Sequence, residues 1–169
     1  GGSLFYSTCS LSTEENEEEL RDAAENGRKA EVRVLLAAGT DPNASWGGWT
    51  ALEAAANNGS EEVVGALAEG GADLDKATNN GATPLMVAAE HGRSGVVRRL
   101  LELGADHTAV GTGGGWEGKT ALVAAEERGE EEAAAVLRGW PTYKALSEED
   151  KAKARIQHLV PTHFYKRTP

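Results

Sequence analysis

Glycine recurs along this chain at intervals that few folds produce. One series falls at spacings of 32, 33 and 37 residues, at Gly27, Gly59, Gly92 and Gly129. In the first three units a second glycine comes 12 residues later, at Gly39, Gly71 and Gly104. A repeated period of this length is typical of stacked-repeat folds, in which no unit can bury its apolar face alone. The chain is therefore expected to pile similar units in a single file.

Within each unit the residue order predicts two helices and a loop. A threonine precedes the first helix in three units, at Thr50, Thr83 and Thr120, where its oxygen can accept an orphan amide of the first turn. The first glycine of each unit ends that helix, and an apolar stripe such as Val96, Val97, Leu100 and Leu101 marks the second helix. The second glycine ends the second helix, and the chain then runs outward as a finger to the next threonine.

This pattern resembles the ankyrin repeat, and the best match runs from Gly81 to Asp106 as G-A-T-P-L-M-V-A-A-E-H-G…V-V-R-R-L-L-E-L-G-A-D. It departs from the family's T-P-L-H motif in the histidine slot, which holds Glu53, Met86 and Val123 in the last three units. The hydrogen-bond network of that histidine is expected to be missing or rebuilt. Glu18 replaces the threonine of the first unit, and Glu126 replaces an alanine of the fourth, so both end units are polar, as terminal repeats should be.

The resemblance implies an all-α fold, an ankyrin-repeat solenoid of helix-turn-helix units with β-hairpin-like fingers. Residues 1–16 form an N-terminal extension, and residues 17–140 form the repeat domain. Its repeats are expected at about 17–47, 48–80, 81–117 and 118–140. The pair Trp140-Pro141 is expected to end the last repeat. Residues 141–169 are a C-terminal extension, with a short helix from about Glu148 to about His158 and an extended tail.

One stretch suggests different chemistry. Residues Gly113 to Thr120 read GGGWEGKT and fit the phosphate-binding pattern G-x-x-x-x-G-K-[ST]. However, Gly118-Lys119-Thr120 occupies the same slot as Gly48-Trp49-Thr50 and Gly81-Ala82-Thr83 in the other units. A phosphate-binding loop also needs a buried strand before it, and Glu117 would repel phosphate. We therefore interpret this stretch as the turn and cap of the fourth unit.

Charge and composition exclude several classes of function. The chain of 169 residues has a net charge of -10, with -13 in residues 1–139 and +3 in residues 140–169, so nucleic acid is not expected as a partner. Apolar runs are too short for a membrane span, so a soluble chain is expected. A single cysteine, Cys9, allows no disulfide within the chain. The histidines show no metal-ligand spacing and no catalytic triad emerges, so we expect no metal, cofactor, small-molecule substrate or enzymatic activity.

Candidate contact residues lie on the fingers and first helices, since the resemblance implies that partners bind the concave face. The fingers measure 11, 12 and 16 residues from the second glycine to the next threonine. Three of the 4 tryptophans lie on them: Trp46, Trp49 and Trp116. Each either folds back over its glycine-rich finger or contacts a partner directly, because buried tryptophans dominate binding hot spots. Glu117, Met86 and His91 complete the candidates on this face.

The two ends of the chain carry further signals. Near the N-terminus, Ser12-x-x-Glu15 is a capping box that opens an acidic first helix, which is either a solvated face or an acidic docking patch. The C-terminal tail holds Phe164, Tyr165, Lys166 and Arg167. Either the C-terminal helix caps the last repeat and the tail frays, or these four residues form a hook that anchors the protein to a larger partner.

The sequence therefore favours a non-catalytic protein-interaction module, a small adaptor or accessory subunit of a larger assembly. Two alternatives stay open: a nucleotide-binding protein that uses Lys119 and Thr120, and a regulatory ankyrin fragment of a longer protein. An intracellular location is expected, either cytoplasmic or, if a transit peptide was removed before Gly1, organellar.

Overall fold

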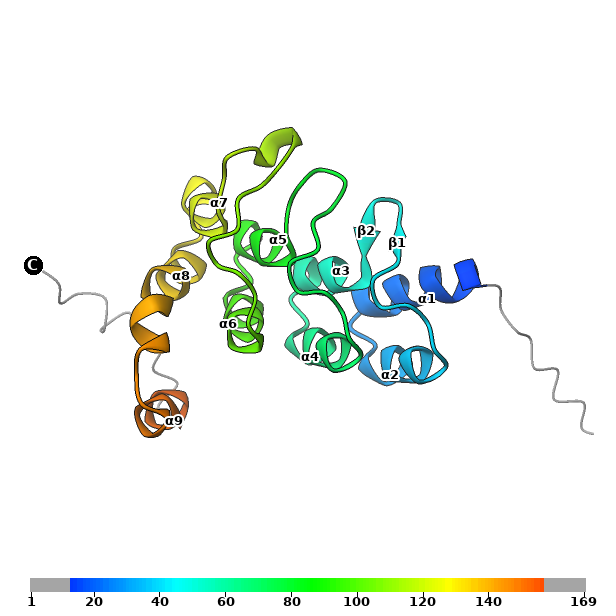
Figure 1. The fold of residues 1–169 in the computed structure, drawn as a ribbon, viewed down its shortest axis with the longest axis horizontal. Helices are drawn as coiled ribbons and strands as arrows, with labels where there is room; N and C mark the ends of the chain where they lie inside the picture. The colour runs from blue at the N-terminus through cyan, green and yellow to red at the C-terminus, as the bar shows by residue number, and fades with distance from the viewer. Residues whose placement is uncertain (1–12, 157–169) are drawn as a thin grey trace, which may run out of the picture.

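The computed structural model describes residues 13–156, and Figure 1 shows helix pairs stacked in single file with loops projecting to one side. The first helices of the pairs are α1 (Thr13–Glu25), α3 (Ala51–Asn58), α5 (Pro84–Glu90) and α7 (Ala121–Arg128). The second helices are α2 (Lys29–Ala37), α4 (Glu61–Glu69), α6 (Ser94–Leu103) and α8 (Glu131–Lys144). Each helix packs on its equivalent in the next pair, so the helices form an inner and an outer layer. The predicted all-α solenoid is confirmed.

Three first helices begin at the threonines that the sequence singled out. The hydroxyl oxygen of Thr50 accepts the backbone N–H of Glu53 at 3.2 Å, and Thr83 accepts that of Met86 at 3.4 Å. Thr120 accepts the N–H of Val123 at 3.4 Å. Each threonine has extended backbone geometry, as a residue that precedes a helix must. The capping prediction is therefore confirmed in all three units.

The core is a continuous cluster of small and branched apolar side chains along the stack. Leu52, Leu67, Leu85 and Leu100 are among its largest aliphatic members, and each is at most 1% exposed. Alanines such as Ala55 and Ala88 are fully buried between the first helices and let their backbones approach closely. Burial of each leucine side chain contributes about 1.5 to 3 kcal/mol. Because these contacts run from pair to pair, the stack gains its stability across the repeat boundaries.

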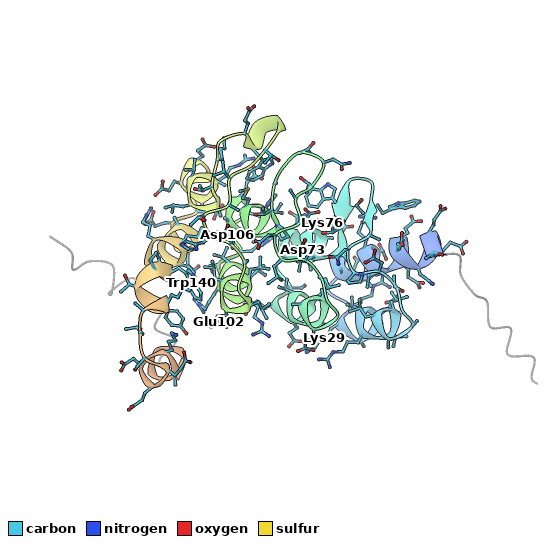
Figure 2. The ribbon with its side chains drawn as sticks, in the orientation of Figure 1. Lys29, Asp73, Lys76, Glu102, Asp106 and Trp140 are labelled. Carbon is cyan, nitrogen blue, oxygen red and sulfur yellow. The ribbon has the colours of Figure 1, made fainter. Side chains whose placement is uncertain are left out.

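The loops that follow the second helices are tied to one another from unit to unit. The N–H of Asp73 donates to Asn43 Oδ1 at 2.7 Å, and the N–H of Asp106 donates to Asp75 Oδ1 at 2.8 Å. Lys76 Nζ donates to the carbonyl of Asn43 at 2.5 Å. Figure 2 shows Asp73, Lys76 and Asp106 in these loops, beside the inner helices and below the finger tips. These bonds fix the spacing at which successive fingers leave the stack.

The C-terminal end differs from the sequence expectation at one point. Helix α8 continues through Pro141 to Lys144, so the helix does not end at Trp140-Pro141. Proline removes one N–H near the end of the helix, and the rings of Trp140 and Tyr143 stack there with centroids 5.1 Å apart. Helix α9 (Glu148–Ile156) begins as predicted, with the hydroxyl of Ser147 accepting the N–H of Asp150 at 3.2 Å. The predicted end at His158 lies outside the described residues.

A candidate protein-interaction surface

The fingers and the first helices form one face of the stack, which we call the inner face. Figure 1 shows the three fingers side by side above α1, α3, α5 and α7, with the outer layer beneath them. The first finger runs from residue 40 to residue 49, the second from residue 72 to residue 82, and the third from residue 105 to residue 119. This surface belongs to no single helix, so its shape depends on the stacking of the units.

The first finger is a tight hairpin that presents a tryptophan. Strands β1 (Ser45–Trp46) and β2 (Trp49–Thr50) pair antiparallel, with Trp46 opposite Trp49. Gly47 and Gly48 form the two-residue turn with φ of 62° and 87°, a left-handed geometry that hairpin turns of this kind require. Trp49 packs against the apolar core, whereas Trp46 is 40% exposed. The two tryptophans of this finger therefore have different environments, and Trp46 is the one open to a partner.

The third finger is lengthened but held in a defined shape. The N–H of Gly111 donates to the carbonyl of Lys119 at 2.8 Å, and the N–H of Gly118 returns to the carbonyl of Gly111 at 3.1 Å. At its tip Gly114–Trp116 form a short 3-10 helix, η1. The N–H of Thr112 donates to the carbonyl of Gly81 at 3.2 Å, which joins this finger to the second. Of the predicted hairpin-like fingers, only the first contains paired strands within the described residues.

A hollow of about 370 Å³ lies between the third finger and the first helices. Trp116 and Gly115 line it from the finger, and Ala124 lines it from α7. Trp116 is half-buried and packs against the core, so its indole contributes both to the fold and to the hollow. An aromatic wall beside a small alanine gives a partner side chain a place to insert.

Two ion pairs border this hollow. Lys119 Nζ lies 2.6 Å from Glu127 Oε2, and the guanidinium of Arg128 on α7 pairs with Glu90 on α5. All four side chains line the hollow. The second pair joins two successive repeats, although an exposed pair of this kind contributes at most about 1 kcal/mol. The charges at the border of the hollow therefore balance.

The geometry of residues Gly113 to Thr120 is that of a finger and a helix cap. Thr120 caps α7, and Lys119 is engaged with Glu127. The residues from Ala105 to Gly113 form the ascending side of the finger and contain no strand. A phosphate-binding loop needs such a strand directly before it. The interpretation of this stretch as a turn and cap is therefore confirmed.

The histidine slot of the second unit holds a buried carboxyl group. Glu53 is 0% exposed, and its Oε2 accepts the backbone N–H of Thr50 at 2.7 Å. Its Oε1 has no hydrogen-bond partner among the described residues. Burial raises the pKa of Glu53 from 4.5 to about 7, against the opposing effects of the Thr50 hydrogen bonds and the Lys76 charge. The expected network is thus rebuilt here around a carboxyl group that links the first finger to α3.

The remaining candidates divide into accessible and inaccessible residues. Glu117 on the third finger and His91, which directly follows α5, are exposed, and His91 Nδ1 lies 2.9 Å from the carbonyl of Val87. Met86 is 0% exposed, so its proposal as a contact residue is wrong. Its side chain fills the histidine slot of the third unit and packs in the core, because a thioether has no charge to keep hydrated. Phe164, Tyr165, Lys166 and Arg167 lie outside the described residues, as does Cys9.

Acidic charge is concentrated in the inner layer. Helices α1, α3, α5 and α7 carry 11 acidic and 2 basic side chains, a net -9. Helices α2, α4, α6 and α8 carry 7 acidic and 6 basic side chains, a net -1. In the outer layer, charges pair between neighbouring helices, as in Lys29–Glu62 at 3.1 Å and Arg33–Glu69 at 3.3 Å. The acidic excess of the repeats therefore lies on the layer that carries the fingers.

Comparison with known families agrees with this geometry. A family model described as ankyrin repeats, with 3 copies, matches residues 20–111. The chain belongs to the ankyrin-repeat family. Ankyrin repeats are generally protein-protein interaction modules, and this ankyrin-repeat protein stacks a further pair, α7 and α8, beyond the matched region. Comparison with curated protein sequences gives no match.

Two other features of this ankyrin-repeat protein bear on its chemistry. Between residues 13 and 156, no helix has the length and apolar character needed to cross a membrane. The same part of the chain gathers no group of three or more metal-ligating side chains.

The sequence predicted the fingers and their tryptophans but not the hollow beside Trp116, since its walls come from three segments that only the stacking brings together. The burial of Glu53 has a signal in the sequence, because an acidic residue stands there in the histidine slot of the repeat motif.

Proposed function

We propose that this ankyrin-repeat protein is a non-catalytic adaptor or accessory subunit that docks on a larger intracellular protein assembly through its inner face. The observation that carries the proposal is the exposed indole of Trp46 on a rigid hairpin, on the same face as the Trp116 hollow. A large apolar group left partly open beside the turn of a hairpin is well placed to fill a partner's pocket. The preorganised finger also lowers the entropy cost of binding.

The charge of the inner layer favours a partner segment rich in lysine and arginine. Apart from the buried Glu53, the first helices carry 10 acidic and 2 basic side chains, and this net -8 attracts cationic groups over roughly a Debye length of 8 to 10 Å at physiological salt. The near-neutral outer layer offers no such attraction. The partner is therefore proposed to meet the fingers and first helices.

The test compares two single substitutions of exposed apolar residues. Trp46→Ala removes the finger indole, and Val34→Ala on α2, where the valine is 67% exposed, is the matched control on the outer layer. Each variant is used to capture proteins from native extract, and the captured proteins are quantified by mass spectrometry. The proteins that Trp46→Ala loses and Val34→Ala retains are then purified and titrated calorimetrically.

The expected result is a loss of affinity of about thirtyfold or more for Trp46→Ala, as for a hot-spot residue, with a thermal midpoint within about 2 °C of the parent. Capture profiles that are the same for both variants would contradict the proposal.

A shortened variant that lacks residues 157–169 tests the C-terminal hook, whose loss is expected to weaken the same complex. Trp116→Ala is expected to lower both affinity and thermal midpoint, because this indole also packs against the core.

A further inference from the structure

Glu53 lies where the first finger joins the helix stack. Thr50 is both the last residue of β2 and the residue that caps α3. Its N–H donates to Glu53 Oε2 at 2.7 Å, and its hydroxyl oxygen accepts the N–H of Glu53 at 3.2 Å. The corresponding slots of the next two units hold Met86 and Val123, which carry no charge. A single ionisable group thus closes the joint between the finger that carries Trp46 and the helix beneath it.

This joint accommodates the neutral carboxyl group better than the charged one. Glu53 Oε1 is buried without a hydrogen-bond partner among the described residues, and an ionised carboxylate with an unsatisfied oxygen is costly in a protein interior. For this reason burial raises the pKa of Glu53 to about 7. Both protonation states are therefore populated near neutral pH.

The charged groups of the surrounding elements offset this cost only in part. From the second finger, Lys76 lowers the pKa of Glu53, but its Nζ already donates to the carbonyl of Asn43 at 2.5 Å. Helix α1, which packs on α3, carries one basic side chain, Arg21, and its guanidinium pairs with Glu25 at 2.9 Å.

The other two helices against α3 bring no compensating cation to the joint. The charged side chains of α4 are Glu61, Glu62 and Glu69, all exposed, and that of α5 is Glu90, which pairs with Arg128. The buried side chains of these two helices are apolar.

We propose that Glu53 is a proton-operated latch that holds the first finger closed on α3 and releases it when the carboxyl group ionises. In the released state the Thr50 joint opens, so the carboxylate reaches water. The consequence for binding rests on the proposed function, because the latch would control how firmly Trp46 is presented to a partner.

The size of the effect follows from the two protonation equilibria. With a pKa of about 7 when closed and 4.5 when hydrated, the ratio of open to closed fingers rises about tenfold between pH 6 and pH 8. The ratio rises between about pH 4.5, below which both forms are protonated, and about pH 7, above which both forms are ionised, so most of the tenfold change falls between pH 6 and pH 7.

The experiment needs no partner, so it can fail independently of the proposed function. Amide hydrogen exchange is measured by NMR at pH 6, 7 and 8 and corrected for the intrinsic exchange rate. The protection of the Thr50 N–H is expected to fall about tenfold over this range. The Thr83 N–H is the internal control, because its slot holds Met86, and its protection is expected to stay constant. Glu53→Gln should abolish the pH dependence at Thr50.

Two hydrogen-exchange results would overturn the latch. A fall in protection that Thr83 shares would assign the effect to the whole stack, and constant protection at Thr50 would show that ionisation does not open the joint. A titration of the Glu53 side-chain carboxyl by ¹³C NMR in the unmodified protein supplies a second measurement if Glu53→Gln fails to fold. A midpoint near 4.5 there would also contradict the proposal, and a midpoint near 7 would support it.

Discussion

At the scale of single residues, the same slot of the repeat accepts side chains of different chemistry. The slot holds Glu53, Met86 and Val123 in the last three units, and the first two are fully buried. In the second unit Glu53 forms a capping box with Thr50, and in the third the Met86 Sδ lies 3.5 Å from the Thr83 N–H. The threonine cap is thus the fixed part of the motif, and the slot residue determines whether the joint responds to pH.

Glu53 should make the stability of the fold depend on pH. Because its pKa of about 7 in the folded chain exceeds the unfolded value of 4.5, the carboxyl group stays protonated to a higher pH in the folded chain than in the unfolded chain. The contribution of Glu53 to the free energy of unfolding is fully present below about pH 4.5 and is lost as the pH rises through about 7. We compare the free energies of unfolding of Glu53→Gln and the parent. As the pH rises from 5 to 8, their difference should shift in favour of the variant by about 2 to 3 kcal/mol.

Urea unfolding at a series of pH values measures this difference. Glu117→Gln is the matched control, since Glu117 is exposed on the third finger and its replacement should leave the pH dependence unchanged. If the free energy of unfolding had the same pH dependence in Glu53→Gln and the parent, ionisation of the buried carboxyl group would not affect stability.

Element by element, the sequence predicted helices far better than their ends. The threonine caps and the glycine spacing located the first helices, because both signals are local in the chain. The end of α8 could not be found in this way. Pro141 removes one N–H, but it lies in the last turn of a helix that continues only to Lys144, where Trp140 and Tyr143 stack. A local signal for a break was therefore overridden by the packing of the residues around it.

The contact between the second and third fingers can be tested with two glycines. A Cβ on Gly81 would lie 2.4 Å from the backbone nitrogen of Gly113, whereas a Cβ on Gly71 would meet nothing within 4 Å. Both have positive φ, at 78° and 91°, so alanine pays a similar backbone cost at either position. We expect Gly71→Ala to destabilise the fold by about 1 kcal/mol and Gly81→Ala by about 2 to 4 kcal/mol.

Thermal unfolding followed by circular dichroism compares the two glycine variants. Tryptophan fluorescence should also change in Gly81→Ala, because the third finger, which carries Trp116, can no longer rest on the second. Equal losses in the two variants would mean that the fingers do not support one another.

For the whole molecule, the stacking order separates two kinds of surface. The sequence gives the total charge, but the assignment of that charge to layers depends on which helices face the fingers. The inner helices carry a net -9 and the outer helices a net -1. The hollow beside Trp116 likewise exists only once α5, α7 and the third finger are placed together. Both features arise from contacts between units, which a periodic pattern alone does not describe.

The final prediction concerns how this charge acts on association. If the inner face binds a cationic partner segment, raising NaCl from about 0.05 M to 0.5 M should slow association, because screening shortens the range of attraction. Glu14→Gln with Glu18→Gln on α1 should lower the association rate by about threefold at low salt. Glu61→Gln with Glu132→Gln changes the net charge equally on the outer layer and should have little effect. Surface plasmon resonance with the captured partner measures both, and equal rates for the two double variants would place the partner elsewhere.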